Sequence, residues 1–212
     1  MRLALIGIVS SLCCVTYANA ESVDSAYTKL NFENGCVWAK SNSAEEASMG
    51  GSAVCAGYSF NGNSWPVYFA EGDIRQFVSF GNIANTNALA GGFSEWNGVN
   101  TTIEWRLKNG KPFATILRWF IDTVNPDTGS ADKKHQGNVL VISKVAQKNN
   151  PYSCVIGYVD ARANKDANVM ARQVADTHGA LFVCGVHEAR FFGKRGEYSG
   201  TPRELAEDQR RN

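Results

Sequence analysis

The sequence predicts an α+β domain, in which a mostly antiparallel β-sheet, strongly curved or two-layered, carries one main helix near its C-terminal end. Three observations lead to this class. Short apolar or alternating runs fill most of the chain, a single helical stripe of small apolar residues follows residue 164, and four cysteines lie downstream of an apolar N-terminal segment. With 44% hydrophobic and 19% charged residues, the chain has the composition of a folded globular protein.

Residues 1–20 have the organisation of a secretory signal peptide. Arg2 is followed by the apolar run Leu3–Val15, and residues 18–20, Ala-Asn-Ala, have the small-x-small pattern of a cleavage site. As a helix, the apolar run would span about 20 Å, less than the roughly 30 Å hydrocarbon core, which favours a cleaved leader over a membrane anchor. Cys14 leaves a lipoprotein open as an alternative. After cleavage, no integral membrane segment is expected.

Strands are expected where short apolar or β-branched runs lie between turn residues. Besides the hairpin described next, these runs are Val54–Tyr58, Val67–Glu71, Arg75–Phe80, Asn138–Val145 and Cys154–Asp160. The run Val139–Ile142 is short and β-branched, which favours a buried strand over a helix.

The clearest strand signal is a β-hairpin. The run Ile103–Leu107 alternates apolar and polar residues, and residues 113–121 are apolar on both faces, as in a central strand. The Asn109-Gly110 pair between them is typical of a type I′ turn. A regular two-residue turn then fixes the register, so that Trp105 pairs with Ala114.

One helix is predicted after residue 164. Its apolar residues form one stripe, which consists of Ala167, Met170, Ala171, Val174 and Ala175. Either Asn164 or Asp166 can cap its N-terminus, and Gly179 fits the position just after its last turn, where a left-handed glycine often ends a helix. The small side chains of the stripe allow close packing on a sheet.

Four of the six cysteines remain after cleavage of the leader. An even number in an exported chain indicates disulfides and an oxidising compartment, either the periplasm or the cell exterior. Because sequence neighbours tend to be spatial neighbours, we predict the pairs Cys36–Cys55 and Cys154–Cys184. A zinc site is the alternative, but the chain has no CxxC spacing and its three histidines are scattered, so no metal is expected.

The composition predicts a single globular β-rich domain over residues 21–193 and a disordered polar tail over residues 194–212, which is rich in charge and glycine and poor in apolar residues. The 21 Lys+Arg residues nearly balance the 20 Asp+Glu residues, so the chain carries no global field that would attract nucleic acid. Because it contains neither a P-loop nor an HExxH motif, no cofactor is expected.

Three carboxylates are weak catalytic candidates. Glu71 and Asp73 lie two residues apart between predicted strands, where they can act as an acid/base pair or bind a cation. The alternative is an ordinary turn, in which Gly72 supplies an unusual φ and Arg75 pairs with a carboxylate. Asp160 precedes the predicted helix, in a loop that either binds a ligand or caps the helix.

Four residues are candidates for ligand binding. Arg162 lies in the same loop as Asp160, close to a predicted helix N-terminus that attracts anions. Phe93 and Trp96 lie in residues 81–100, a long segment rich in Gly, Asn and Ala. Tryptophan can stack on sugars, but in strands it more often fills the core.

The fourth candidate, Arg118, interrupts an apolar strand. A buried guanidinium needs a partner, so Arg118 pairs with an acid or with several backbone carbonyls, or binds an anionic ligand, unless it is simply solvated. Glu71 and Glu104 are the possible acids, although in the expected register Glu104 faces the other side of the sheet.

Several strings together resemble a family of small exported proteins of alphaproteobacteria that has no assigned function. These strings are Ala70–Arg75, Phe77–Ser79, Ile103–Arg106, Pro112–Ile116, Tyr158–Asn164, Asp166–Asn168 and Ala171-Arg172. The resemblance covers about Cys55–Cys184. It implies a periplasmic location and supports the later cysteine pair, but it transfers no catalytic residue.

The leading hypothesis is therefore a periplasmic or secreted, non-enzymatic protein with a binding or envelope-associated role, whose ligand is a small molecule, a glycan or a protein. One alternative is a hydrolase of cell-envelope glycans that uses Glu71, Asp73 or Asp160. Another is a secreted inhibitor or interaction module. An enzyme should bring these carboxylates together, a binding protein should expose aromatic side chains, and an inhibitor should present a protruding loop on a rigid scaffold.

Overall fold

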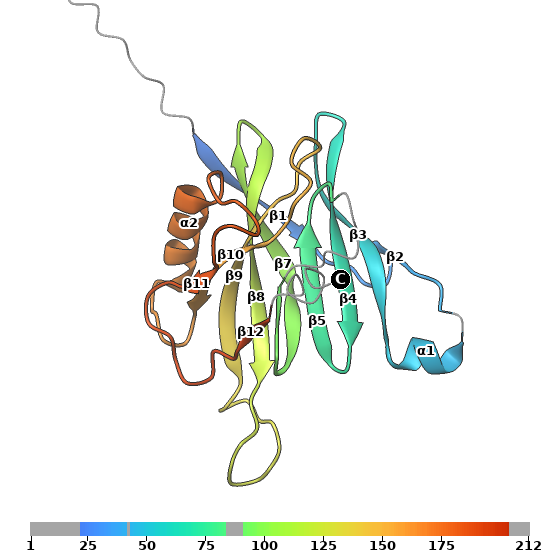
Figure 1. Ribbon diagram of the computed structural model, residues 1–212, viewed down its shortest axis with the longest axis vertical. Coiled ribbons are helices and arrows are strands. Elements are labelled where there is room, and N and C mark those ends of the chain that lie inside the picture. The colour runs from blue at the N-terminus through green and yellow to red at the C-terminus, as the bar shows by residue number, and fades with distance from the viewer. Residues whose placement is uncertain (1–21, 42, 84–90, 204–212) are drawn as a thin grey trace, which may run out of the picture.

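The computed structural model describes residues 22–41, 43–83 and 91–203 (Figure 1). The strands are β1 (Val23–Lys29), β2 (Cys36–Trp38), β3 (Gly50–Phe60), β4 (Asn63–Gly72), β5 (Arg75–Phe80), β6 (Gly92–Phe93), β7 (Trp96–Lys108), β8 (Lys111–Asp122), β9 (Gly137–Lys144), β10 (Val155–Asp160), β11 (Arg190–Phe191) and β12 (Pro202–Arg203), and the helices are α1 (Ala44–Ser48) and α2 (Ala167–His178). The predicted leader and residues 204–212 lie outside the described residues.

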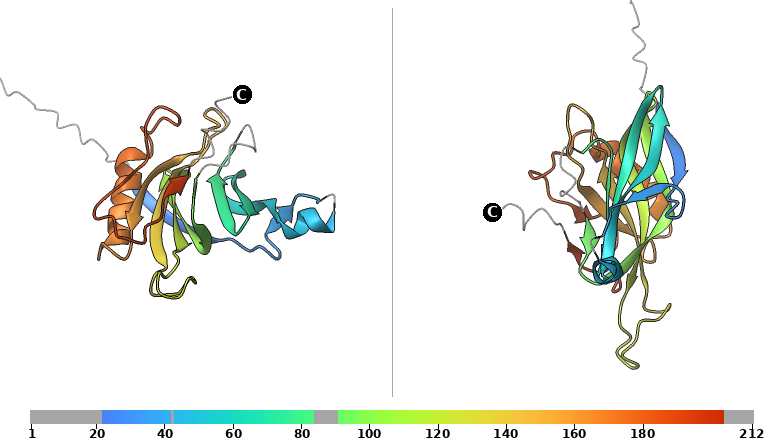
Figure 2. Two further views of the ribbon diagram at one scale, coloured as in Figure 1. Left: turned by 60° about the horizontal axis from the view of Figure 1, so that its bottom comes forward. Right: turned by 90° about the vertical axis from the view of Figure 1, so that its right-hand side faces the viewer.

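The strands form two main sheets and one helix covers the larger of them. The six-stranded sheet has the order β1-β7-β8-β9-β10-β11, and the four-stranded sheet has the order β2-β3-β4-β5. All pairings are antiparallel except β10 with β11. Figure 2 shows α2 on one side of the six-stranded sheet and the four-stranded sheet on the other. The predicted antiparallel, two-layered sheet is confirmed, but strands so dominate the chain that the class is mostly all-β rather than α+β.

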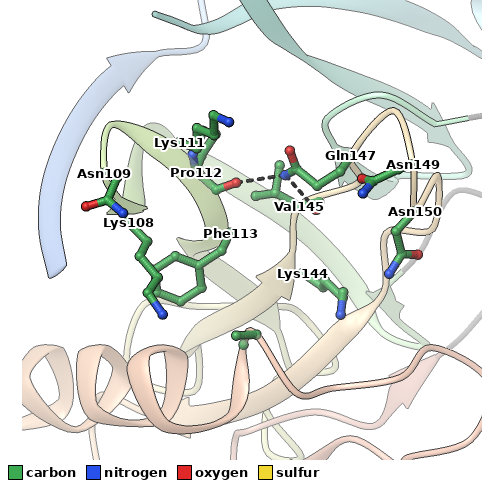
Figure 3. A pocket seen from close by; sticks show the side chains of 12 residues that line it. Lys108, Asn109, Lys111, Pro112, Phe113, Lys144, Val145, Gln147, Asn149 and Asn150 are labelled. Carbon is green, nitrogen blue, oxygen red and sulfur yellow. Dashed lines mark hydrogen bonds between the residues drawn. The ribbon is translucent and has the colours of Figure 1, made fainter. Parts of the chain in front are cut away.

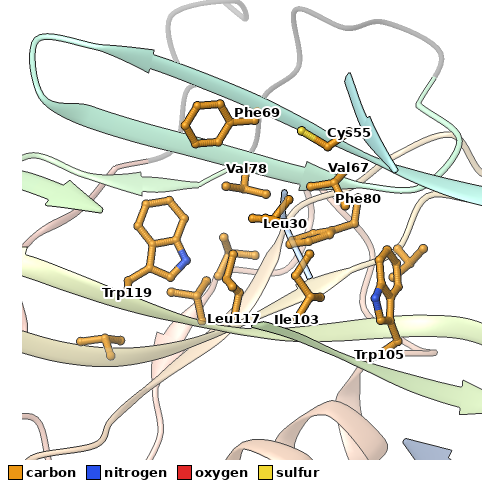
Figure 4. Packing of buried hydrophobic residues seen from close by; sticks show 14 of the residues in the cluster. Leu30, Cys55, Val67, Phe69, Val78, Phe80, Ile103, Trp105, Leu117 and Trp119 are labelled. Carbon is orange, nitrogen blue, oxygen red and sulfur yellow. The ribbon is translucent and has the colours of Figure 1, made fainter. Parts of the chain in front are cut away.

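Two apolar cores separate these layers. The core between the two sheets contains the large side chains Phe69 and Phe80 from one sheet and Trp105, Leu117 and Trp119 from the other (Figure 4). The core under α2 uses smaller residues, which are Ala114, Ile116, Leu140, Ile142, Ala167, Ala171, Val174 and Ala175 among others. The all-round apolar character of residues 113–121 therefore reflects a strand that is covered on both faces.

The register of the β7–β8 hairpin differs from the predicted one. The turn pairs Lys108 with Lys111 as a two-residue loop does, but a bulge follows, and Trp105 pairs with Thr115 instead of Ala114. Pro112 cannot donate to the ladder, and Phe113 is the extra residue. The shift by one residue turns Glu104 to the face that α2 covers, opposite to the prediction.

Helix α2 is confirmed, but its ends are built differently from the prediction. Asp166 is the N-cap residue without a side-chain capping bond, and Asn164 bonds instead to the backbone of Asp160 and Lys194. Gly179 has right-handed backbone angles. A Cβ at Gly179 would lie 2.9 Å from the ring of Phe113, so close packing explains the glycine better than a left-handed turn does.

Both predicted disulfides are present. Cys36–Cys55 joins two residues that face each other across β2 and β3, and Cys154–Cys184 ties the start of β10 to the loop between α2 and β11. Two intramolecular disulfides indicate an oxidising, extracytoplasmic environment. Within the described ranges, no helix has the length and apolar character needed to cross a membrane.

The predicted disordered tail is wrong for residues 194–203. This segment folds back on the domain, where Gly196 and Ser199 bond to Asp160, and β12 pairs with β6. Hydrogen bonds to a buried carboxylate hold this segment on the domain. Amino-acid composition, which reports mainly on apolar content, does not predict such bonds.

Candidate functional site

Asp160 is a structural anchor. Its side chain is only 2% exposed and accepts four hydrogen bonds: from the backbone N–H groups of Arg162 (2.7 Å), Ala163 (2.9 Å) and Gly196 (2.9 Å), and from the Ser199 hydroxyl (2.6 Å). Burial by itself raises the pKa of Asp160, but these bonds outweigh it, so the net pKa lies below the usual range of a carboxyl. A carboxylate saturated in this way is poorly suited to exchange protons with a substrate.

Glu71 and Asp73 lie close together but are engaged locally. Both line a cavity of about 510 Å³ beside α1. Glu71 accepts a hydrogen bond from Gln76 (2.6 Å), and Asp73 pairs with Arg75. The left-handed residues of this turn are Asp73 (φ 50°) and Ile74 (φ 57°), not Gly72 as predicted. Asp160 belongs to the other sheet, so the three catalytic candidates do not converge on one site.

Arg118 has amide partners rather than an acid. Its guanidinium donates to the side-chain oxygens of Asn138 (2.5 Å) and Asn168 (3.2 Å), at the start of α2. Burial lowers the pKa of Arg118. The expected pairs with Glu71 and Glu104 are both wrong, because Glu71 bonds to Gln76 and Glu104 to Arg172.

We therefore expect Glu71→Gln to leave the melting temperature unchanged. The variant keeps an acceptor for Gln76 and leaves no buried charge behind, because Arg118 is not its partner. Differential scanning calorimetry of the two proteins at pH 7 tests this. A fall of several degrees in the melting temperature would contradict this expectation, because it would show that Glu71 stabilises a positively charged group in addition to its hydrogen bond with Gln76.

The other binding candidates are dispersed. Phe93 is fully buried, with its ring against Trp119 and Tyr158, and cannot reach a ligand. Trp96 begins β7 and is 43% exposed. Arg162 donates to the backbone of Gln136 (2.6 Å) and lies over the ring of Tyr198, and so it braces the segment after β11.

The structure adds a pocket that sequence reasoning did not single out. It has a volume of about 450 Å³ and lies between the β7–β8 hairpin, the β9–β10 loop and the end of α2 (Figure 3). It is lined by Lys108, Asn109, Lys111, Pro112, Phe113, Lys144, Val145, Gln147, Asn149, Asn150, Gly179 and Ala180. Three of these residues are lysines and four are amides, and no carboxylate is among these lining residues.

The fold fixes the walls of this pocket. The amide of Gln147 donates to the backbone of Pro112 (2.8 Å) and its oxygen accepts from Trp65 (3.1 Å), which clamps the β9–β10 loop to the hairpin. The bulge directs Phe113 toward Gly179, so that its half-buried ring stands between the hairpin and α2. The pocket is thus braced by side chains that are themselves engaged.

Three lysines from the strands β7, β8 and β9 line this pocket. Lys108 and Lys111 face each other across the Asn-Gly turn. Lys144 reaches from β9 toward the loop after α2, where its ammonium bonds to the backbone oxygen of Phe182. Burial lowers the pKa of Lys144, which means that its charge is incompletely solvated and that an anion placed beside it would be favoured.

No protein-family model matches the chain, and neither does any curated protein or solved structure that it was compared with. The resemblance to an exported alphaproteobacterial family stays a prediction. The geometry described above is therefore the basis for assigning a function.

Proposed function

We propose that this chain is an exported, non-enzymatic binding protein of the periplasm or the cell exterior, and that its pocket between the β7–β8 hairpin and the end of α2 holds an anionic group. The observation that carries the proposal is the lining of this pocket, which includes Lys108, Lys111 and Lys144 and no carboxylate. Mutual repulsion between neighbouring lysines slightly destabilises the folded state, and a bound anion would reduce this repulsion.

The lining also limits the kind of ligand. Asn109, Asn149 and Asn150 can donate and accept hydrogen bonds, which suits the oxygens of a phosphate, a carboxylate or a sugar. The ring of Phe113 offers an apolar surface beside them. The ammonium groups and these amides are hydrogen-bond donors of the kind that hold an anion.

Titration calorimetry with inorganic pyrophosphate at low salt tests the proposal. We expect the oxidised protein to bind it, and Lys144→Met to weaken binding about tenfold, since a charge-assisted hydrogen bond contributes about 1.5 kcal/mol or more. Lys165→Met is the matched control, because Lys165 is an exposed lysine just before α2, at the opposite end of that helix.

Two results would contradict the proposal. One is the absence of any heat of binding with pyrophosphate and with a multivalent carboxylate such as citrate. The other is an equal loss in the Lys144→Met and Lys165→Met proteins, because it would show that attraction is general and not a property of the pocket. Unchanged melting temperatures would confirm that both variants fold.

A further inference from the structure

We infer that the end of the molecule around this pocket docks on a bilayer surface that contains anionic phospholipids, with apolar side chains inserted beside lysine-bound phosphate groups. This inference rests on the proposed function, because it identifies the anion in the pocket as a lipid headgroup. Three observations carry it: exposed apolar side chains beside the pocket, the rigidity of the loop that presents them, and the place where the chain enters the domain.

Apolar side chains flank the pocket and point into solvent. Leu181, which follows the pocket residue Ala180, is 77% exposed, and Val186 in the same loop is 72% exposed. Tyr152, two residues after the pocket residue Asn150, is 64% exposed. Large apolar side chains gathered in this way on a water-facing surface mark an interaction site.

The loop that carries Leu181 and Val186 is held in one conformation. The Cys154–Cys184 disulfide ties it to the start of β10, close to Tyr152. Phe182 turns inward, where it is buried against the ring of His187, and its N–H bonds to the backbone of His178 (2.9 Å). The loop thus keeps Phe182 inside and its neighbours outside, so the exposure of Leu181 is built into the fold.

The lysines at this end of the molecule favour a bilayer surface that carries negative charge. The chain as a whole is nearly neutral, so attraction to an anionic bilayer has to come from a local cluster. Lys108, Lys111 and Lys144 form such a cluster next to the apolar loop. Lysines beside exposed Leu, Val and Tyr are the combination by which peripheral proteins bind anionic interfaces, with apolar groups in the acyl boundary and ammonium groups at the phosphates.

The polypeptide also enters the domain at this end. Val23, the first residue of β1, pairs with Lys108 at the hairpin, and Figure 1 shows β1 beginning at the same end as the β7–β8 turn. The segment that follows the predicted cleavage site therefore starts beside Lys108. A docking face at this end lies beside the start of the domain.

Vesicle co-sedimentation of the oxidised protein tests the inference. We expect binding to vesicles of phosphatidylglycerol and phosphatidylcholine, and none to phosphatidylcholine alone. Leu181→Ser combined with Val186→Ser, which adds no charge, should lower the partition coefficient at least tenfold while leaving pyrophosphate binding intact. Val169→Ser, which changes an exposed valine on α2 away from the loop, should have no effect.

The outcomes separate this inference from the proposed function. If pyrophosphate binds but phosphatidylglycerol vesicles do not, the membrane inference is overturned and the anion site stands. If the protein binds neither pyrophosphate nor phosphatidylglycerol vesicles, the proposed function and the membrane inference are both wrong. If the wild type elutes as a dimer that Leu181→Ser combined with Val186→Ser dissociates, and does not bind vesicles, the apolar loop is an interface between copies and the membrane inference is wrong.

Discussion

Arg106→Met should lower the free energy of unfolding by about 3–5 kcal/mol, because it removes one member of a buried network of charges. Arg106 and Glu104 are both buried on the face of the six-stranded sheet that α2 covers. Arg106 donates two hydrogen bonds to Asp176 on α2 (2.8 and 2.7 Å) and a third to the hydroxyl of Ser25. Without it, Asp176 loses both of these bonds, and the buried Glu104 keeps Arg172 but loses the second guanidinium beside it.

The network also joins three elements. Glu104 on β7 accepts from Ser25 on β1 (2.6 Å) and from Arg172 on α2 (2.7 Å). The hydrogen bond from Arg172 to Glu104 is the main reason that the pKa of Arg172 is raised. The variant should therefore loosen α2 on the sheet, which amide hydrogen exchange along Ala167–His178 would detect.

Urea unfolding followed by circular dichroism measures this effect, and the chain offers a matched control. Arg75 pairs with the exposed Asp73 and donates to the backbone oxygen of Ser94 (2.7 Å), and no buried carboxylate depends on it, so Arg75→Met should cost about 1–2 kcal/mol. Equal losses in the two variants would show that the buried network contributes no more than a surface ion pair.

Asp160→Asn should lower the free energy of unfolding by about 3 kcal/mol. Each carboxylate oxygen of Asp160 accepts two hydrogen bonds. Whichever oxygen the amide nitrogen of Asn replaces, it would face at least one backbone N–H that then has no acceptor, and the remaining bonds would no longer be assisted by a charge. In this variant the segment 194–203 should also detach from the domain more often, so trypsin should cleave after Lys194 and Arg195 faster than in the wild type.

The effect of Asp160 should also depend on pH with a definite sign. Its folded-state pKa is lowered, so its contribution to stability is present above the unfolded-state pKa of about 4 and is lost as the pH falls through the lower folded-state value. The stability difference between wild type and Asp160→Asn should shrink below about pH 4. Thermal unfolding at several pH values measures this.

Two further variants make the Asp160 result specific. Ser199→Ala removes one of the four donors and should cost about 1 kcal/mol, and Asp127→Asn changes an exposed carboxylate in the β8–β9 loop and should cost almost nothing. A loss in Asp160→Asn as small as that in Asp127→Asn would contradict the role of Asp160 as an anchor.

Local patterns in the sequence were sufficient for the strands β3, β4, β5, β7, β8, β9 and β10, for α2 and for both disulfides, but they did not predict β1, β2, α1 or the short strands β6, β11 and β12. Apolar periodicity, an Asn-Gly turn and cysteine spacing act over short stretches, and the structure retains them. The face of Glu104 was mispredicted because the bulge at Phe113 shifts the β7–β8 pairing by one residue, and each residue of β7 beyond it then shares a face with the opposite set of β8 side chains. Alternation alone does not show where a bulge occurs.

The candidate site was harder to predict for a different reason. Its lysines come from a hairpin turn and from a strand end, where lysine is unremarkable, and only the fold brings Lys108 and Lys144 to one pocket. Conversely, Asp160 has the position expected of a loop ligand, but residues 196 and 199 use up its acceptors. The one usable signal was the pair of lysines that flanks Asn109-Gly110.

The pairing of early with late segments sets the order in which this chain can fold. Ser25 on β1 bonds to Glu104, 79 positions later, and Glu95 beside β6 bonds to Thr201, 106 positions later. Such distant pairings make folding slow, because the chain between them must be ordered before the contact forms. Because β1 pairs with the middle of the chain and the middle pairs with residues near its end, the fold can be completed only after the residues around Thr201 have been synthesised.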